Sequence, residues 1–439
     1  MTLQPVFDGH RPAAAAAEDP VPPVTPVPPV NPFAAAAEAI LPDLRALRRR
    51  LHAQPEVGLE LFRTQDAVLE SLAGLDLEIT TGMSLSSVTA VLRGGAPGPV
   101  VLLRGDMDAL PITEATGLDY ASANGAMHAC GHDLHVAGLV GAARLLHERR
   151  DELPGTVVLM FQPGEEGHGG GRIMIEEGVL EAAGERPAAA YAIHVDATTP
   201  YGTFVSRPGP IMAGVSALRI LVEGTGGHAA APHLAVDPVP VAAELILAIQ
   251  GFVARRIPAN DPAVVSIGRL ASDSQAGNVL AREVVMEANL RHFSEQTLAL
   301  LRDDLPELLR GLARAHGCTA EVVFVPSYPA TVNDAAEASA VLARLEELHG
   351  GHHVVRMPEP AMTSEDFSYV LQRVPGALVF LGAMPGDTGP APAPMHSEGV
   401  RFDDRILGVQ AAALADLAWQ RLRRGPAAGD GVAEEGAVR

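Results

Sequence analysis

Four short, almost wholly apolar segments, separated by helical stretches, are the feature that most constrains this chain. Strands are expected at Val100–Leu103, Thr156–Phe161, Ala189–Ile193 and Ala377–Leu381. Continuous apolar character, in place of alternation, is typical of strands covered on both faces. Amphipathic helices are expected over 37–52, 64–73, 134–149 and 405–422. This order predicts an α/β fold with a largely parallel sheet and helices on both faces.

The block 213–327 follows a different pattern. Apolar residues alternate along part of its first segment, SALRILVEG, which favours a strand with one exposed face. The expected elements that follow are a helix near 238–255, strands near 263–270 and 283–290, and a helix near 295–316. This βαββα-like order predicts a small inserted α+β domain that serves as a lid or dimerisation domain.

Both ends of the chain have compositions that cannot bury a core. Residues 1–33 are rich in Pro and Ala, and residues 425–439 form a loose acidic stretch. We therefore expect a disordered arm and a flexible tail. Between them, 34–212 and 328–424 make up the expected catalytic, metal-binding domain around the insert.

Charge and composition argue against several classes of function. The formal net charge is −21, whereas phosphate binding needs a basic surface, so no nucleic-acid partner is expected. The chain has no lysine, which excludes Schiff-base chemistry and a phosphate loop ending in Gly-Lys. No apolar run reaches ~18 residues, so no membrane partner is expected. Two cysteines, Cys130 and Cys318, and no apparent secretory signal favour a cytoplasmic location.

Polar side chains follow three of the expected strands at the point where each strand ends. VVLLR leads to Asp106 and Asp108, TVVLMF leads to Glu165 and Glu166, and AYAI leads to His194. In open α/β sheets, sites form beyond the carboxyl ends of the strands, so these groups are candidate ligands or acid–base groups. The alternative for the two aspartates is a turn or capping role.

The segment MHACGHDLH adds a further group of candidates. One glycine separates Cys130 from His132, and this spacing lets a thiolate and an imidazole reach one metal ion, or two adjacent ions, from a single loop. His396 arrives later, in a Pro-rich loop. A lone Cys-x-His pair is weak support for a metal site by itself. His128 and His135 are interpreted as structural residues or as neighbours of ligands.

Glu165 and Glu166 differ from an ordinary solvated pair of glutamates, because they follow an apolar strand and precede a Gly-rich loop. Neighbouring residues on extended chain point in different directions. One carboxylate is therefore free to bind a metal ion while the other faces a reacting water. Metal-dependent hydrolysis needs both a ligand and a free base.

An ordered set of motifs runs through residues 37–424. It consists of RRRLHAQPEVGLE, LLRGDMDALP, MHACGHDLH, FQPGEEG, AIHV, GGHAAAPH, the dipeptide DP near 237, TSEDF, VPGALVFLGA and MHS. In order and spacing, the set resembles the aminoacylase and carboxypeptidase metallohydrolases, and specifically their amidohydrolase branch. That branch includes hippurate hydrolases and indoleacetyl-amino-acid hydrolases.

The resemblance implies a centre of two divalent metal ions, with zinc, manganese, cobalt and nickel as candidates. It implies that Glu165 is the general base and later the proton donor, and that Asp106 is an acid that supports a ligand. The implied metal ligands are Cys130, His132, Glu166, His194 and His396.

The inserted domain contributes further residues by resemblance. His228 in GGHAAAPH is implied to reach across a dimer interface into the partner's active site. Asn278 and Arg291 are implied to contact the substrate carboxylate or the lid, although NVLA and the segment before Arg291 depart from the family's usual pattern. A homodimer, or a tetramer of dimers, is therefore expected.

The implied activity is hydrolysis of the amide bond of N-acyl amino acids, hippurate-like, N-acetyl or similar, by metal-activated water. Two alternatives stay open at this point. One is a dipeptidase or aminopeptidase-like metallopeptidase, and the other is a non-catalytic ligand-binding relative. The presence of Glu165 beside all five candidate ligands argues against the second alternative, because binding alone needs no free base.

Overall fold

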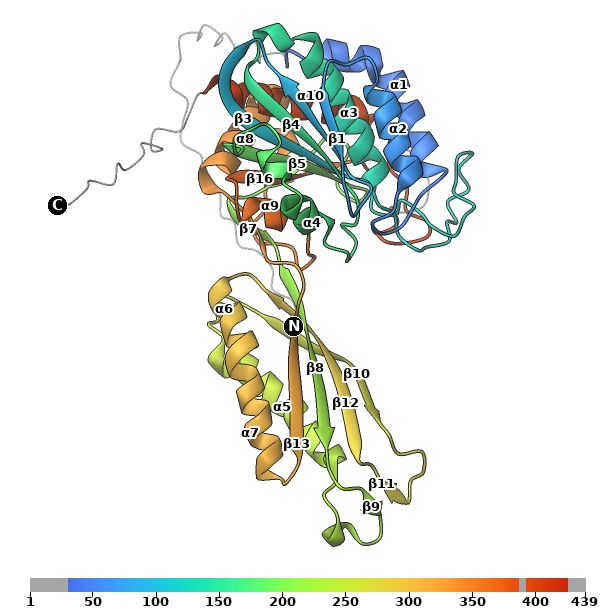
Figure 1. The fold of residues 1–439 in the computed structure, drawn as a ribbon, viewed down its shortest axis with the longest axis vertical. Coiled ribbons are helices and arrows are strands. Elements are labelled where there is room, and N and C mark those ends of the chain that lie inside the picture. Colours follow the sequence, from blue (N-terminus) through green and yellow to red (C-terminus); the bar gives the residue numbers. More distant parts are fainter. Residues whose placement is uncertain (1–30, 387–391, 425–439) are drawn as a thin grey trace, which may run out of the picture.

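The chain folds into two units that lie end to end (Figure 1). The structure, a computed structural model, describes residues 31–386 and 392–424. The expected tail 425–439 and most of the expected arm 1–33 lie outside these residues. The last residues of that arm are packed on the fold, because Phe33 is buried with its ring centroid 5.6 Å from that of Trp419. Asn31 Nδ2 also donates to the carbonyl of Ala412 (3.2 Å).

The larger unit is built on a mixed sheet in the order β1-β2-β4-β3-β5-β16-β6-β15. Its centre, β4-β3-β5-β16, is parallel throughout, while β1, β2 and β6 add antiparallel pairings towards the edges. The strands are β1 (Glu78–Thr81), β2 (Val88–Arg93), β3 (Ala96–Asp106), β4 (Pro154–Gln162), β5 (Ala189–Asp196), β6 (Phe204–Ser206), β15 (Val354–Arg356) and β16 (Gly376–Gly382).

Both faces of this sheet are covered, as the continuous apolar strands predict. Along β3, Val101 and Leu103 pack into one core, and Val100 and Leu102 pack into another on the opposite face. The first core takes residues from α1 (Ala34–His52), α2 (Phe62–Leu72), α3 (His132–Glu148), α8 (Ala335–His349) and α10 (Ile406–Arg423). The second takes residues from α4 (Gly170–Glu176), α9 (Ser368–Leu371) and the 3-10 turn η2 (Val179–Glu181). The predicted α/β fold class is confirmed.

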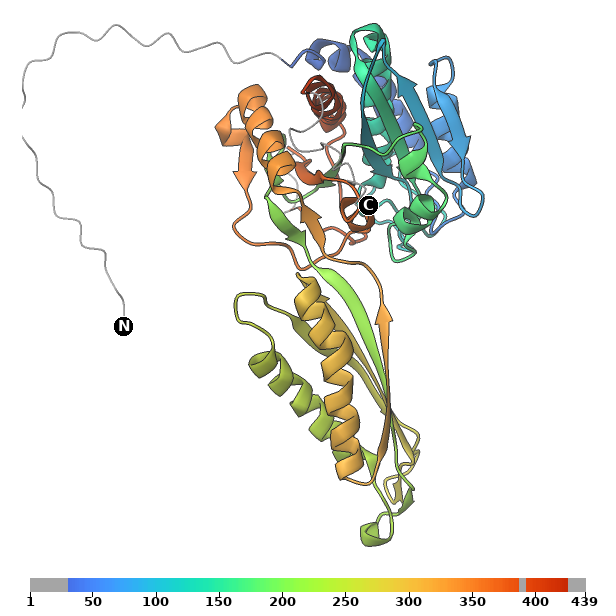
Figure 2. The same ribbon diagram turned by 60° about the vertical axis from the view of Figure 1, so that its left-hand side comes forward.

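The smaller unit is an antiparallel sheet in the order β10-β12-β8-β13. Only one of its faces is packed: Leu218, Ile220 and Val222 of β8 join a core with the helices α5 and α7. Figure 2 shows both helices on the same side of the strands. The elements are β8 (Gly214–Glu223), α5 (Pro238–Arg256), β10 (Val264–Ser272), β12 (Glu283–His292), α6 (Glu295–Ala299), α7 (Leu305–Ala315) and β13 (Thr319–Pro326).

Two short ladders complete the fold. β7 (Gly209–Met212) pairs with β14 (Thr331–Asn333) where the chain enters and leaves the smaller unit. β9 (Gly227–His228) pairs with β11 (Val279–Leu280) at the far tip of that unit (Figure 1). Because every strand of the antiparallel sheet lies between Gly214 and Pro326, we propose 213–327 as the inserted domain and 34–212 with 328–424 as the catalytic domain.

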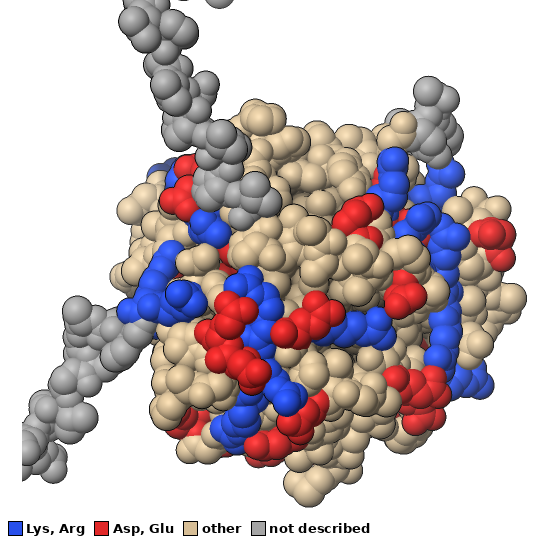
Figure 3. Space-filling view, turned by 90° about the horizontal axis from the view of Figure 1, so that it is seen from above, with Lys and Arg blue, Asp and Glu red and all other residues tan. Residues whose placement is uncertain are grey.

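Among the described residues, α5 is long and apolar enough, by length and composition alone, to cross a membrane. One face of it, with Val241, Leu245 and Ile249, is buried in the core of the inserted domain, while Leu247 is exposed. On the face of the larger unit that points away from the inserted domain, basic and acidic side chains are interleaved (Figure 3).

Candidate metal centre

Three neighbouring parallel strands bring polar residues to one edge of the larger sheet. β3 ends at Asp106, β4 leads into Glu165 and Glu166, and β5 carries His194 near its end. The helix α3 begins beside them at His132. Gly131, just before it, has φ of 86°, and a Cβ there would lie 2.5 Å from Val195 Cγ2. Glycine is therefore required for the Cys130 loop to approach β5 this closely.

The five candidate ligands converge around Cys130. Its Sγ lies 3.2 Å from Nε2 of His396 and 3.6 Å from Nε2 of His194. Two sets of ligand atoms each lie within 4.8 Å of one another, Cys130–His132–His194 and Cys130–Glu166–His396. Cys130 belongs to both sets, so the arrangement describes two adjacent sites with a sulfur atom between them.

The imidazoles are oriented for metal binding. Nδ1 of His132 donates to the carbonyl of Asp108 (2.8 Å), and Nδ1 of His194 donates to that of Val195 (2.7 Å). Because a carbonyl only accepts, both Nε2 atoms keep their lone pairs for a ligand role. Nε2 of His132 is buried and has no hydrogen-bond partner in the described part of the chain. Thiolate, imidazole and carboxylate together fit a pair of divalent transition-metal ions.

The electrostatics of the cluster also favour a cation. Burial opposes ionisation of the Cys130 thiol, but the neighbouring His132 and His194 lower its pKa to about 6. Hydrogen bonds to Cys130 and then Glu166 raise the pKa of His396 to about 10. Each protonated imidazole is stabilised by the negative charge of a neighbouring thiolate or carboxylate. Bound metal ions would displace these protons and supply the positive charge beside the anionic groups.

Glu165 lies beside this cluster, outside the two sets that contain Cys130, and its carboxylate is within 4.8 Å of ligand atoms of His132 and Glu166. Burial, followed by the charge of Glu365 and then Glu166, raises the pKa of its carboxyl well above the usual value. An oxygen of Glu165 lies within 4.8 Å of ligand atoms of Glu365 and Asp366. A carboxylate with high proton affinity is suited to accept a proton from water.

Asp108 supports the loop that carries both glutamates. Its two carboxylate oxygens accept the backbone N–H groups of Glu165 and Glu166, each at 2.9 Å. Asp106, predicted to support a ligand, hydrogen-bonds His135 and lies 3.5 Å from Nε2 of His132. The sequence interpretation singled out Asp106 for support and left Asp108 with a general role. One sequence feature could have predicted that Asp108 also supports the site: Asp106 and Asp108 are two positions apart, and this spacing puts both side chains on the same side of an extended chain.

A buried arginine links this edge of β3 to the TSEDF segment. Arg104 makes ion pairs with Asp106 (2.6 Å), Glu365 (2.8 Å) and Asp366 (3.0 Å). Gln162 adds a hydrogen bond to Arg104 (3.0 Å). The sequence analysis missed this network, because its members are up to 262 positions apart.

The three inserted-domain candidates separate into two places. Arg291 lines the cavity beside the metal-ligand cluster, and its Nη1 is buried without a hydrogen-bond partner among the described residues. His228 and Asn278 lie at the far tip, where Val279 pairs with His228 and Ala229 N donates to the Asn278 carbonyl. Within one chain, the structure brings only Arg291 to the cluster.

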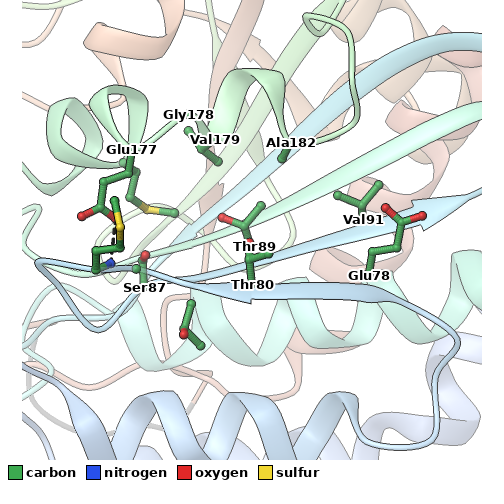
Figure 4. A pocket seen from close by; sticks show the side chains of 13 residues that line it. Glu78, Thr80, Ser87, Thr89, Val91, Glu177, Gly178, Val179 and Ala182 are labelled. Atoms are coloured by element: carbon green, nitrogen blue, oxygen red, sulfur yellow. Dashed lines mark hydrogen bonds between the residues drawn. The ribbon is translucent and has the colours of Figure 1, made fainter.

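Three cavities are candidate sites, and one of them, of about 610 Å³ and lined by Ser294, Glu295 and Asp334 among others, contains none of the clustered metal-ligand groups found among the described residues. The cavity at the cluster measures about 710 Å³ and is lined by Cys130, Glu165 and His396, among others. The third, of about 330 Å³, lies between the β1–β2 strands and the segment after α4 (Figure 4). Its two carboxylates are already engaged, Glu78 with Arg93 and Glu177 with Ser84. The chemistry therefore belongs to the largest cavity.

Comparisons with known proteins agree with this geometry. The sequence pattern of peptidase family M20/M25/M40 matches residues 102–420. Thermostable carboxypeptidase 1 of Saccharolobus solfataricus is 37% identical over 377 residues, 85% of this chain and 93% of that protein. N-acetylcysteine deacetylase of Bacillus subtilis is 34% identical over 377 residues, 85% of this chain and 95% of that protein. A solved Bacillus subtilis structure, described as a dinuclear metal-binding peptidase from the M20 family, matches with a TM-score of 0.76 at 31% identity, covering 88% of this chain and 99% of that one.

Proposed function

Because this chain belongs to peptidase family M20/M25/M40, a family of metal-dependent hydrolases, we propose that it cleaves the amide bond of small N-acyl amino acids. The products are a free amino acid and a carboxylic acid. One observation carries the proposal: Cys130 is shared by two sets of candidate metal ligands, and the carboxylate of Glu165, outside both of these sets, lies within 4.8 Å of ligand atoms of His132 and Glu166. Binding alone would not need that additional base.

The residues of the site divide the reaction between them. When bound, the two divalent ions supply Lewis acidity and lower the pKa of the attacking water to about 7. Glu165 takes the proton of that water on a carboxylate oxygen and returns it to the nitrogen of the leaving amine. Arg291, whose Nη1 has no partner among the described residues, binds the carboxylate of the amino acid.

An apolar wall beside the cluster is the proposed binding surface for the acyl group of the substrate. It is formed by Val205, Met212, Met357 and Phe380, which line the same cavity. The Phe380 ring centroid lies 5.7 Å from that of His194, so the wall reaches the proposed metal ligands. Methionine side chains adapt to irregular apolar shapes. We therefore expect bulky apolar acyl groups, such as benzoyl, to be hydrolysed with a lower KM than acetyl.

The proposal includes a homodimer, or a tetramer of dimers. β10 is an edge strand of the inserted sheet, and Val264 and Leu270 on it are exposed. The neighbouring helix α5 exposes Leu247, of which 73% is accessible. Exposed edges and apolar faces are sites of pairing between chains. In the proposed assembly, His228 at the tip of the inserted domain enters the partner's site.

A cytoplasmic location is also part of the proposal. Both cysteines are free thiols, and Cys130 has to stay reduced to act as a ligand. Reducing compartments keep thiols in that state. Thiolate and imidazole ligands suit zinc, and also cobalt, nickel or manganese, so reconstitution is needed to identify the native ion.

The test is a substrate panel on protein stripped of metal with a chelator and then reloaded with Zn²⁺, Mn²⁺, Co²⁺ or Ni²⁺. The panel contains N-acetyl, N-benzoyl and N-indoleacetyl amino acids together with dipeptides. We expect release of free amino acid from the N-acyl compounds, only after reloading. Faster hydrolysis of dipeptides would favour a peptidase, the class that the name of the carboxypeptidase relative indicates. Equal activity before and after metal removal would rule the proposal out.

A further inference from the structure

The loop that carries Glu165 is rich in conformations that only glycine adopts readily. Gly164, Gly167 and Gly169 have φ of 71°, 84° and 67°. Glycine leaves the backbone many accessible states, so such a loop has little stiffness of its own. The loop has a hydrogen bond of its own at this point, from the N–H of Gly167 to the carbonyl of Glu165 (2.7 Å), and contacts from outside the loop add to it in fixing the position of the carboxylate.

One peptide unit of this loop is held from both sides. The unit between Glu165 and Glu166 offers a carbonyl in one direction and an N–H in the other, because the peptide is planar and trans. The N–H donates to a carboxylate oxygen of Asp108 (2.9 Å). The carbonyl accepts the phenol hydrogen of Tyr328 (2.6 Å). The same phenol oxygen accepts the N–H of Gly169 (3.0 Å), so Tyr328 also closes the loop.

Tyr328 does not belong to the catalytic strands that deliver the candidate ligands. It lies two residues after β13, on the segment by which the chain returns from the inserted domain. Its carbonyl accepts the N–H of Val215, on the outgoing strand β8 (2.8 Å). Val215 in turn pairs with Arg291 across the sheet. The phenol thus joins the loop of Glu165 to the two strands that connect the domains, next to the arginine proposed to bind substrate.

We propose that Tyr328 is a positioning residue for Glu165, setting the orientation of the peptide between Glu165 and Glu166 from the inserted-domain side. This inference rests on the proposed role of Glu165 as the base. The side chain of Tyr328 is 6% exposed and lines the cavity, but its hydroxyl already donates a hydrogen bond to the carbonyl of Glu165. The tyrosine therefore acts through Glu165, and its effect falls on the proton-transfer step.

The variant that isolates this contact is Tyr328→Phe, which removes the hydroxyl and keeps the ring. Misplacement of a reacting group by about 1 Å costs on the order of 100-fold in rate, so we expect kcat to fall roughly 10- to 100-fold. KM is expected to stay within about twofold, because Arg291 and the apolar wall are unchanged, and metal content should stay at the wild-type value.

Tyr369→Phe is the matched control. The ring of Tyr369 packs against that of Tyr328 with centroids 6.0 Å apart, and its hydroxyl donates to the carbonyl of Ser327 (2.8 Å). The Tyr369→Phe variant loses a comparable hydrogen bond next to the same segment, and that bond does not involve the loop of Glu165. We expect wild-type kcat for this variant. An equal fall in kcat for both variants would mean a general loss of packing and would overturn the inference.

A double-mutant cycle with Glu165→Gln separates positioning from structural damage. If Tyr328 acts through Glu165, then adding Tyr328→Phe to Glu165→Gln lowers the residual rate less than about twofold. Full additivity would overturn the inference, and so would loss of metal in Tyr328→Phe. The rates are measured on whichever amide the wild type cleaves, so a wrong acyl specificity leaves the inference intact. Absence of amide hydrolysis in the wild type would overturn the proposed function and the inference together.

Discussion

The two sheets of this chain are covered in different ways. In the larger sheet, β5 is buried along seven of its eight residues, whereas in the inserted sheet β8 alternates between buried and more exposed positions. A sheet packed on both faces can hold side chains in fixed positions at its edge, as the candidate ligands around Cys130 require. The inserted sheet leaves one face and the edge strand β10 accessible, and contributes Arg291 to the cavity. We infer that the catalytic domain carries the chemistry and the pocket for the acyl group, and that the inserted domain contributes Arg291 to substrate binding.

The strongest challenge to this division is Glu165→Gln, which keeps the size of the side chain and removes the base. We expect kcat to fall by on the order of 1,000-fold, within the range for loss of a general acid–base group. Metal content, measured by elemental analysis, should equal that of the wild type because Glu165 is not a proposed ligand. A variant that retains most of its activity would mean that the base is another residue.

The two cysteines give a matched pair, one in each domain. Both are buried free thiols. Cys130→Ala removes the proposed shared ligand and should abolish at least about 90% of the activity and lower the bound metal per chain, because ligand loss weakens metal binding. Cys318→Ala should retain the metal and kcat of the wild type. Equal metal loss in both variants would contradict the role assigned to Cys130.

The difference in burial can be tested by truncating one side chain in each sheet. Leu103→Ala, in the fully buried part of β3, should lower the free energy of unfolding by about 2–5 kcal/mol. Val323→Ala, at a 43% exposed position of β13, should lower it by less than about 1 kcal/mol. Urea denaturation of the two variants at equal protein concentration provides the comparison. Similar losses would show that the face carrying Val323 is covered, as by a partner chain.

Arg291→Ala tests the contribution of the inserted domain to binding. We expect KM for an N-acyl amino acid to rise about 10-fold or more, the size of a lost charge-assisted contact, with little change in kcat. An N-acyl amino acid amide, which lacks the carboxylate, serves as the control substrate, and the variant should hydrolyse it as the wild type does. A fall in kcat with unchanged KM would place Arg291 in the chemistry instead.

A buried histidine beside the metal-ligand loop predicts how the catalytic domain responds to acid. Burial lowers the pKa of His128 to about 3, so the folded state keeps it neutral while the unfolded chain protonates near pH 6.5. Between these values the unfolded state binds the extra proton, so stability falls as the pH is lowered, by up to about 1.4 kcal/mol per pH unit. His128→Gln should show a shallower decline of Tm from pH 7 to pH 4. An identical slope would contradict the assignment.

Continuous apolar segments made the central strands predictable, because burial on both faces leaves no polar position to interrupt them. The antiparallel additions were not predictable in the same way. β1, with the sequence EITT, is exposed at every residue, so nothing in its pattern distinguishes it from a loop. Its place at the edge of the sheet depends on pairing with β2 and not on its own composition.

The sequence predicted the candidate residues that belong to recognisable motifs. It did not predict the residues whose role is to form hydrogen bonds with backbone groups of the site. The five candidate ligands and Glu165 were implied by the resemblance of an ordered set of motifs to a known family. Asp108 acts by accepting two backbone N–H groups, and Tyr328 acts on a carbonyl 163 positions away. Neither contact leaves a local pattern in the sequence, because any residue type supplies the same backbone atoms. Such partners emerge only when the chain is folded.

The sulfur atom at the junction of the two sets of ligands has a consequence for handling the protein. A carboxylate in that position would survive removal of the ions unchanged, but a thiol with a pKa of about 6 is largely thiolate at neutral pH. Cys130 is buried but lines the cavity, so small oxidants such as peroxide reach its thiolate and convert it first to sulfenic acid and then to states that thiols do not restore. Stripped protein stored without a reductant should therefore lose, over time, its capacity to be reactivated by added metal.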